Sequence, residues 1–228
     1  MKSRESNAGL GRHGASGFSL IETMIVVAII VILASITFIS LQPLLKQQHV
    51  TNAYNTTISA MRQARDWAMA QQTSYEVQFS NSATPNTIVV GPTTAFTTDL
   101  RTATYSLPTD VSFVIVTVSG NPPTAAGPDG YGTGAAPIDF GYASPGTTGG
   151  GNIAVYFCPD GSAQIGGCSS GTTQAAGYWM NNWDGGVVYI AQPGNAMSSR
   201  AVTLWGATGR IRGWRLYGKS GGYQWVRQ

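Results

Sequence analysis

An uninterrupted apolar segment near the N-terminus is the feature that most constrains how this chain folds. Residues 18–41, FSLIETMIVVAIIVILASITFISL, form a run of 24 residues with a single charged side chain, Glu22. An α-helix rises about 1.5 Å per residue, so this run would span about 36 Å, and a bilayer core is roughly 30 Å thick. The sequence therefore predicts a membrane-spanning helix rather than the buried helix of a soluble core.

The charges on either side of the apolar segment predict how the chain is oriented. The 17 residues before it contain Lys2, Arg4 and Arg12 but a single acidic residue, Glu5, and the first charge after it is Lys46. Since lysine and arginine are enriched on the cytoplasmic side of membrane spans, we expect the N-terminus to stay in the cytoplasm and the remainder of the chain to be exported.

Two other roles for the apolar segment have to be weighed. A secretory signal has a shorter apolar run of roughly 7–15 residues and a small-residue cleavage site, whereas this run is longer and ends in TFISLQP. A plain membrane anchor would explain the length, but it gives no reason for a carboxylate near the start of the span. The length and the end of the run thus disfavour a secretory signal, and a plain anchor leaves Glu22 unexplained.

Glu22 needs a partner or a function, because a carboxylate at the centre of a membrane helix costs roughly 2.5–3.5 kcal/mol on insertion scales. It lies four residues after Phe18, which is about one helical turn. If the chain were cut between Gly17 and Phe18, the new α-amine of one subunit could neutralise Glu22 of an adjacent one. Such a pair would select the register of assembly, because an unpaired buried charge is heavily penalised.

The same residues resemble a known processing signature. The sequence GFSLIE at 17–22 resembles the GF-S/T-LxE motif of type IV pilins and type II secretion pseudopilins. The resemblance implies that a prepilin peptidase cuts after Gly17 and methylates the amine of Phe18. It also implies that the protein is inserted in the inner membrane with a periplasmic domain, and that Glu22 guides it into a filament with other pseudopilins or pilins.

One position departs from that pattern. Many relatives carry a helix-bending proline a few residues before Pro43, where this chain has Ile39. A bend, if the helix has one, would therefore come later here.

From residue 44 to about residue 72 the pattern remains helical and becomes amphipathic. The apolar positions recur every three or four residues, which predicts a helix packed on a sheet; they are Val50, Tyr54, Ile58, Met61, Ala64 and Ala68. The segment MRQARDWA at 61–68 resembles the AR-xx-A pattern that closes this helix in the GspH/FimT branch of minor pseudopilins and pilins.

Residues 73–228 are predicted to be rich in β-strands. Short runs of Val, Ile, Tyr and Phe alternate with Gly, Pro, Asn and Asp clusters; the candidate strands are Tyr75–Phe79, Thr87–Val90, Thr102–Leu107, Val111–Val118, Ile153–Phe157, Val187–Ala191, Ala201–Trp205 and Arg210–Tyr217. Several strands after one long helix favour a pilin-like α+β fold, with antiparallel sheets packed on the helix.

We therefore expect a leader at 1–17, a transmembrane and stem helix at 18–72, and a periplasmic GspH/FimT-like domain at 73–228. Within that domain residues 120–151 contain 10 Gly and 5 Pro, which predicts a long surface excursion.

The two cysteines, Cys158 and Cys168, bracket the sequence PDGSAQIGG. In an exported domain the default expectation is a disulfide, which stabilises by about 2–3 kcal/mol through loop closure. Two unpaired buried thiols are the alternative. A metal site is disfavoured, because no nearby His or second Cys pair supplies the remaining ligands.

Little in the sequence supports catalysis. His13 would be removed with the leader and His49 lies at the base of the stem, so a Ser-His-Asp arrangement in the β-rich domain has no base. The carboxylates are scattered among loop residues, where Asp commonly serves turns; they are Asp99, Asp110, Asp129, Asp139, Asp160 and Asp184. The glycine loop at 130–134 lacks the strand–helix context of a dinucleotide site. We therefore predict no enzyme, no catalytic residue and no cofactor.

The charges are segregated along the chain. Residues 18–65 carry a net charge of +2, residues 66–199 carry −7 from eight acids and one base, and residues 200–228 carry +6 without an acid. Aromatic residues are interleaved with the C-terminal bases. This pattern makes the C-terminal segment the candidate for contacts with an anionic partner.

In the segment WGATGRIR at 205–212, a glycine-rich turn leads into a predicted strand. Because side chains alternate along a strand, Arg210 and Arg212 would lie on one face, about 6–7 Å apart. Beside Trp214 they could contact phosphates and stack on a base, so Arg210, Arg212 and Arg215 are candidate DNA-binding residues. The alternative is intramolecular: the arginines lie over tryptophans or pair with acidic residues of this domain or a neighbouring subunit.

The sequence TGRIR at 208–212 resembles the GRxR segment near the end of GspH/FimT domains, and residues 156–157 and 160–161 extend that resemblance. It implies a minor pseudopilin of a type II secretion system, near the tip of a periplasmic filament, that contacts other pseudopilins or secreted cargo. In some FimT-like pilins the arginine pair binds DNA for uptake, so a minor type IV pilin is the alternative.

Overall fold

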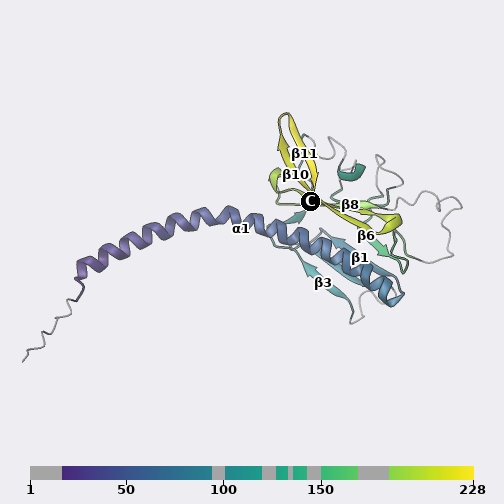
Figure 1. Ribbon diagram of the computed structural model, residues 1–228, viewed down its shortest axis with the longest axis horizontal. Helices are drawn as coiled ribbons and strands as arrows, with labels where there is room; N and C mark the ends of the chain where they lie inside the picture. Colours follow the sequence, from purple (N-terminus) through teal and green to yellow (C-terminus); the bar gives the residue numbers. More distant parts are fainter. Residues whose placement is uncertain (1–16, 94–100, 120–126, 133–135, 143–149, 169–184) are drawn as a thin grey trace, which may run out of the picture. The chain divides into compact units, whose positions relative to one another are not determined.

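The computed structural model describes residues 17–93, 101–119, 127–132, 136–142, 150–168 and 185–228 (Figure 1). The chain divides into two compact units, Met1–Leu44 and Leu45–Gln228. One helix, α1, covers Leu20–Gln71 and so contributes residues to both units. Pro43 lies inside α1 and does not end it.

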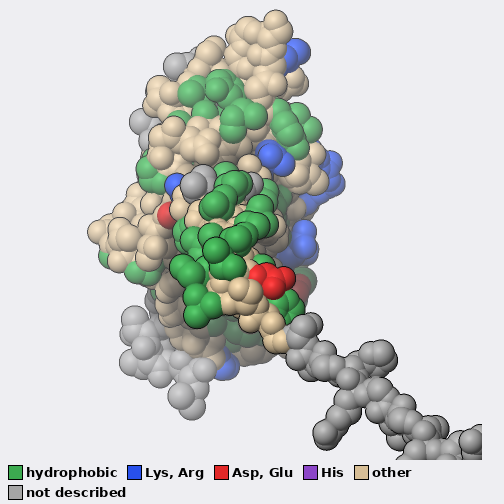
Figure 2. All heavy atoms as spheres, turned by 90° about the vertical axis from the view of Figure 1, so that its left-hand side faces the viewer, with side chains coloured by type: hydrophobic (Ala, Val, Ile, Leu, Met, Phe, Trp, Pro, Cys, Tyr) green, Lys and Arg blue, Asp and Glu red, His purple; other side chains and the backbone are tan. Residues whose placement is uncertain are grey.

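The N-terminal unit contains the apolar part of α1. This part is long and apolar enough to cross a membrane by length and composition. Its large hydrophobic side chains are exposed, and Figure 2 shows hydrophobic side chains gathered on it. The hydroxyls of Ser35 and Thr37 donate to the carbonyl oxygens of Val31 and Leu33, one turn earlier. Those polar groups are thereby satisfied within the helix, as an apolar environment requires.

The C-terminal unit holds two antiparallel sheets. Sheet 1 has the strand order β3 (Ala103–Ser106), β2 (Thr87–Pro92), β1 (Tyr75–Ser80), β6 (Ala154–Phe157) and β7 (Ala163–Gln164). Sheet 2 has the order β11 (Gly222–Arg227), β10 (Arg210–Lys219), β9 (Arg200–Trp205), β8 (Gly186–Ala191) and β4 (Ser112–Phe113), and β5 (Ile138–Phe140) also pairs with β8. Single 3-10 turns lie at η2 (Pro128–Gly130), η4 (Ala196–Ser198) and η5 (Gly206–Thr208).

The part of α1 after Leu44 packs on these sheets through its predicted apolar positions. Val50, Met61, Ala64 and Ala68 are buried in a core shared with both sheets, and Tyr54 packs against it. The alanines allow the helix backbone to approach the strands closely. The predicted α+β, pilin-like fold with a long helix packed against antiparallel sheets is therefore confirmed.

The sequence predicted the strands well where apolar residues alternate over several positions. It predicted them poorly where only two or three residues pair. The run predicted at 111–118 pairs only at Ser112–Phe113. The strands β5, β7 and β11 were not predicted. The first two have three and two residues, too few for a periodic pattern.

The prediction that residues 120–151 form a surface excursion is wrong for the parts of this segment that the structure describes. Tyr131 and Tyr142 are fully buried in a second apolar cluster, with Val187 and Tyr189 of β8. Phe140 is equally buried in the main core. Glycines at positive φ, such as Gly132 at 81°, let the backbone turn back onto sheet 2. The segment is therefore partly a core element rather than a loop in solvent.

Candidate functional site

The residues of the processing motif lie at the start of α1. Gly17 and Phe18 precede the helix, which begins at Leu20, and the Phe18 side chain is 81% exposed. The carbonyl of Ser19 accepts hydrogen bonds from the N–H groups of Glu22 (3.0 Å) and Thr23 (3.2 Å). Glu22 is exposed in the first turn, and within the described part of the chain its carboxylate has no ion-pair partner. A compensating charge in a membrane would have to come from outside these residues.

Arg212 is engaged within the molecule. Its guanidinium lies 2.7 Å from Oδ1 of Asp129 and 5.1 Å from the centre of the Trp205 ring. The Arg212 and Asp129 side chains are only 20% and 7% exposed. The other carboxylate oxygen, Oδ2, accepts hydrogen bonds from Thr203 Oγ1 (2.6 Å) and Trp205 Nε1 (3.2 Å). The structure thus gives Arg212 the intramolecular role that the sequence left as an alternative.

The other two candidate arginines differ from Arg212 and from each other. Arg210 is exposed at the first position of β10. Arg215 has the opposite parity along β10, so its side chain lies on the other face of sheet 2. Its guanidinium carbon lies 4.9 Å from the centre of the Tyr217 ring. The three arginines therefore do not form a single basic cluster.

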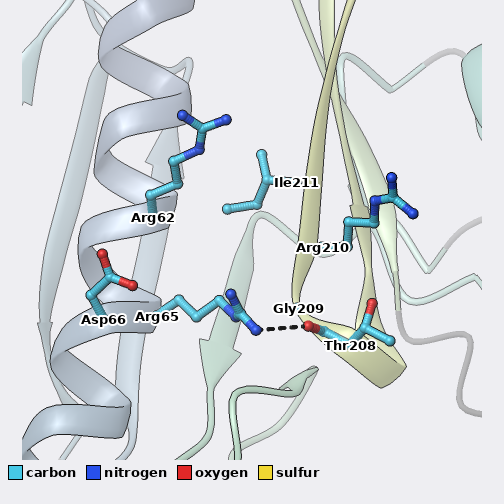
Figure 3. Close-up of a pocket in the computed structure, with 7 residues that line it drawn as sticks. All are labelled: Arg62, Arg65, Asp66, Thr208, Gly209, Arg210 and Ile211. Atoms are coloured by element: carbon cyan, nitrogen blue, oxygen red, sulfur yellow. Dashed lines mark hydrogen bonds between the residues drawn. The ribbon is translucent and has the colours of Figure 1, made fainter.

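A cleft of about 380 Å³ separates α1 from the turn before β10 (Figure 3). Three arginines and one carboxylate line it, together with Thr208, Gly209 and Ile211; the charged residues are Arg62, Arg65, Asp66 and Arg210. In Figure 3 the Arg210 guanidinium points away from the helix, whereas Arg62 extends toward Ile211. The residues that line the cleft carry an excess of positive charge.

Arg65 connects α1 to two turns of the β-rich unit. Its Nε donates to the carbonyl of Gly161 (3.1 Å), and its Nη2 donates to the carbonyl of Thr208 (3.2 Å). Gly209 follows at φ 57°, and a Cβ there would overlap the Gly161 carbonyl oxygen. Only glycine fits this backbone conformation and this close approach without strain.

The Gly161 turn lies inside the loop that the cysteines close. The structure joins Cys158 and Cys168 in a disulfide. Asp160 Oδ1 accepts hydrogen bonds from the N–H (2.9 Å) and the hydroxyl (2.6 Å) of Ser162. These bonds lower the pKa of the Asp160 carboxyl. The loop is thus braced from within and attached to α1 through Arg65.

Of the other candidate carboxylates, Asp139 also makes hydrogen bonds within the fold. Asp139 is buried and accepts hydrogen bonds from the Tyr142 hydroxyl (2.7 Å) and the Gly151 N–H (2.8 Å). Asp99 and Asp184 lie outside the described residues. Among the described residues there is no group of three or more His, Cys, Asp or Glu side chains arranged to hold a metal ion.

His49 has a partner that the sequence did not reveal. Its Nδ1 lies 2.8 Å from Oδ1 of Asp110, and Gln192 Nε2 donates to Oδ2 of the same carboxylate at 2.9 Å. Burial opposes ionisation of Asp110, but the hydrogen bonds from His49 and Gln192 outweigh it, so its pKa is lowered. These contacts fasten α1 to the segments before β4 and after β8.

The N-terminal segment matches a known family model. The model described as "Prokaryotic N-terminal methylation motif" matches residues 12–38, which contain Gly17, Phe18 and Glu22. The chain is a type IV pilin- or pseudopilin-like protein with an N-terminal methylation motif.

The motif implies processing by prepilin peptidase, anchoring in the inner membrane before assembly, and assembly with pilins. Proteins of this kind are structural subunits and typically non-enzymatic. No curated protein and no solved structure matches the chain.

Proposed function

We propose that the protein is a minor pseudopilin of a type II secretion system, assembled at or near the tip of the periplasmic pseudopilus. In this proposal prepilin peptidase removes residues 1–17 and methylates the α-amine of Phe18. The apolar part of α1 then anchors the subunit in the inner membrane. The β-rich domain contacts other pseudopilins or secreted cargo. The function is mechanical and interfacial, without a catalytic step.

One observation supports the GspH/FimT branch in particular. The two segments that carry this resemblance, at 61–68 and 208–212, are far apart in sequence but in contact in the fold. Arg65 of the first segment donates a hydrogen bond to the carbonyl of Thr208 in the second. If the turn at the start of the GRxR segment accepts a hydrogen bond from the helix arginine in this branch, both sequence patterns serve the same contact between helix and sheet.

Glu22→Ala is expected to reduce incorporation into filaments without preventing membrane insertion. Removing the carboxylate leaves the Phe18 amine of the neighbouring subunit without its counter-charge in low dielectric, which is costly. A loss of 1.4 kcal/mol already corresponds to about a tenfold loss of binding. We therefore expect at least about a tenfold lower recovery of the chain in sheared filaments, measured by immunoblot against the membrane fraction.

Thr23→Ala provides the matched control. The Thr23 hydroxyl already donates to the carbonyl of Leu20 within the same helix (2.8 Å), and its loss leaves the charge of Glu22 in place. It should assemble normally. Normal incorporation of the Glu22→Ala variant would rule out charge pairing as the assembly mechanism.

The second candidate function is a minor type IV pilin that binds DNA for uptake. The observation that favours it is the exposed Arg210 beside the arginine-lined cleft. The candidate arginines differ in how accessible they are to DNA: Arg210 is exposed, whereas Arg212 is paired with Asp129. Arg210 is therefore the residue whose replacement tests phosphate contact most directly.

Mobility shifts with the full chain in non-ionic detergent test this second function. DNA binding should weaken with salt, and Arg210→Ala should weaken it further and reduce the salt slope by about 1, the value expected for one phosphate contact. Arg212→Ala should also weaken binding, but with a loss of stability. Arg227→Ala, at an exposed position at the end of β11, is the control. Absence of binding at low salt would eliminate this candidate.

A further inference from the structure

Two arginines lie directly opposite each other in sheet 2. Arg200 of β9 is the cross-strand partner of Arg215 of β10. Residues directly opposite on antiparallel strands have Cβ atoms about 4.5–5.5 Å apart, and like charges at such positions are destabilising. Both side chains lie on the face that carries Val202 of the main core. The arrangement is costly for a subunit on its own.

The charge of this pair is not compensated within the described residues. Arg200 is only 9% exposed, and its Nη1 donates to the carbonyls of Ser198 and Ser199, both at 3.3 Å. Arg215 stacks on Tyr217, and its Nε is buried without a hydrogen-bond partner. Among the described residues no carboxylate forms an ion pair with either guanidinium.

The environment of Arg200 reflects this imbalance. Burial disfavours the charged guanidinium and the positive charge of Arg215 adds to the effect, which lowers the pKa of Arg200 to about 10. Buried charges in proteins are normally paired, because leaving one unpaired is strongly destabilising. Arg212, on the opposite face of β10, follows that rule through Asp129. Arg200 and Arg215 depart from it, which points to a partner outside the subunit.

Exposed apolar side chains lie around the pair. Val226 of β11 is directly opposite Arg215 and 43% exposed, and Tyr217 is 37% exposed. Arginine and tyrosine are enriched at protein–protein interfaces. The surroundings therefore favour a protein partner over a free anion or a lipid headgroup.

We propose that Arg200 and Arg215 form a docking site for an Asp or Glu side chain of a different filament subunit. The carboxylate would lie against both guanidiniums, with Tyr217 and Val226 around it. This inference rests on the proposed function, because it requires that the chain assembles with other pilin-type subunits.

A different subunit is favoured over a second copy because, after Leu44, few acids in the described part of this chain are free. Asp139 is buried, the Asp129 side chain is 7% exposed and paired with Arg212, and Asp110 is held by His49 and Gln192. Asp160 accepts hydrogen bonds from Ser162, Glu76 is hydrogen-bonded to Tyr156, and the exposed Asp66 lies in the cleft with Arg62 and Arg65. We therefore expect the partner to present an exposed acid of its own.

Site-specific photo-crosslinking tests the proposal. The photoreactive residue p-benzoyl-phenylalanine replaces Val226 in the full chain, expressed in cells that assemble the filament. We expect an adduct to a different protein that carries its own methylation motif, with Asp or Glu in the crosslinked peptide. Combining Arg200→Gln with Arg215→Gln should reduce the adduct at least tenfold, whereas Arg227→Gln should leave it unchanged. Changing the partner's acid to Arg should restore the adduct with Arg215→Glu.

A stability measurement separates docking from a purely structural role. In the purified full chain in detergent, Arg215→Gln should raise the unfolding midpoint by about 2–4 °C, because it removes the repulsion of Arg200. A structural arginine would lower the midpoint instead. A lower midpoint would overturn the proposal, and so would an adduct that does not depend on the arginines.

Three further outcomes are informative. An adduct to a lipid or to a second copy of this chain would overturn the assignment of the partner. Absence of any protein adduct, while the chain is recovered in filaments, would overturn the docking site but not the proposed function. Absence of the chain from filaments would count against the proposed function itself.

Discussion

Asp129→Ala is expected to lower the free energy of unfolding of the β-rich unit by about 3 kcal/mol, the cost typical of removing one partner of a buried ion pair. The substitution leaves Arg212 as an uncompensated cation beneath Trp205. It also removes the acceptor for the Thr203 hydroxyl and the Trp205 N–H. Asp129 has φ 57°, which alanine tolerates poorly, so the backbone adds to the cost.

Tryptophan fluorescence during urea unfolding of the full chain in detergent measures this change; Trp205, one of six tryptophans in the chain, lies at the site. Asp129→Asn is the matched control. Asparagine tolerates positive φ and keeps an acceptor oxygen but loses the charge, so we expect a smaller loss of about 1–2 kcal/mol. If the Asp129→Ala variant unfolded at the same urea concentration as the parent chain, the ion pair would not hold residues 127–132 on sheet 2.

Gly209→Ala is expected to have the second large effect, a loss of about 2–5 kcal/mol in the free energy of unfolding. Two costs contribute. The left-handed conformation costs a non-glycine residue about 1–2 kcal/mol, and overpacking adds roughly 1–3 kcal/mol. The added Cβ would overlap the Gly161 carbonyl oxygen and would lie 2.9 Å from Arg65 Nε. It would therefore separate the helix from both turns that Arg65 joins.

Gly221→Ala is the control for the backbone contribution. Gly221 has φ 90°, and an added Cβ there would have no neighbour within 4 Å. It should therefore show only the conformational cost, about 1–2 kcal/mol. Both variants are compared by urea unfolding of the full chain in detergent. Equal losses for the two glycines would contradict the idea that contact with Gly161 and Arg65 fixes this turn.

The long helix could be predicted from sequence because its signals are local. An apolar run of this length admits few structures, and Val50, Met61 and Ala64 recur at helical spacing over several turns. The processing motif is equally local, and it is the part that the family model matches. Strands that are defined by pairing with a distant part of the chain were harder to predict from the sequence. Strand β5 has three residues and is defined by its pairing with β8, about fifty residues later, within a segment whose glycines and prolines suggested a loop.

The roles of the arginines illustrate the same limit. The acidic middle and basic end of the sequence suggested internal pairing as an alternative, but not which pair would form. Asp129 and Arg212 are 83 residues apart, and only the fold brings them together. Arg200 and Arg215 lie opposite each other because of the register between β9 and β10, and the amino-acid composition does not determine that register.

Strand β10 separates its arginines by parity. Arg212 faces one side and completes the fold of its own subunit, whereas Arg215 faces the other side, where its charge remains unbalanced. A one-residue insertion in the 206–209 turn, if it shifted β10 by one position, would exchange every side chain between the two faces. The length of that turn thus decides which cation serves the subunit's own stability and which remains available for assembly.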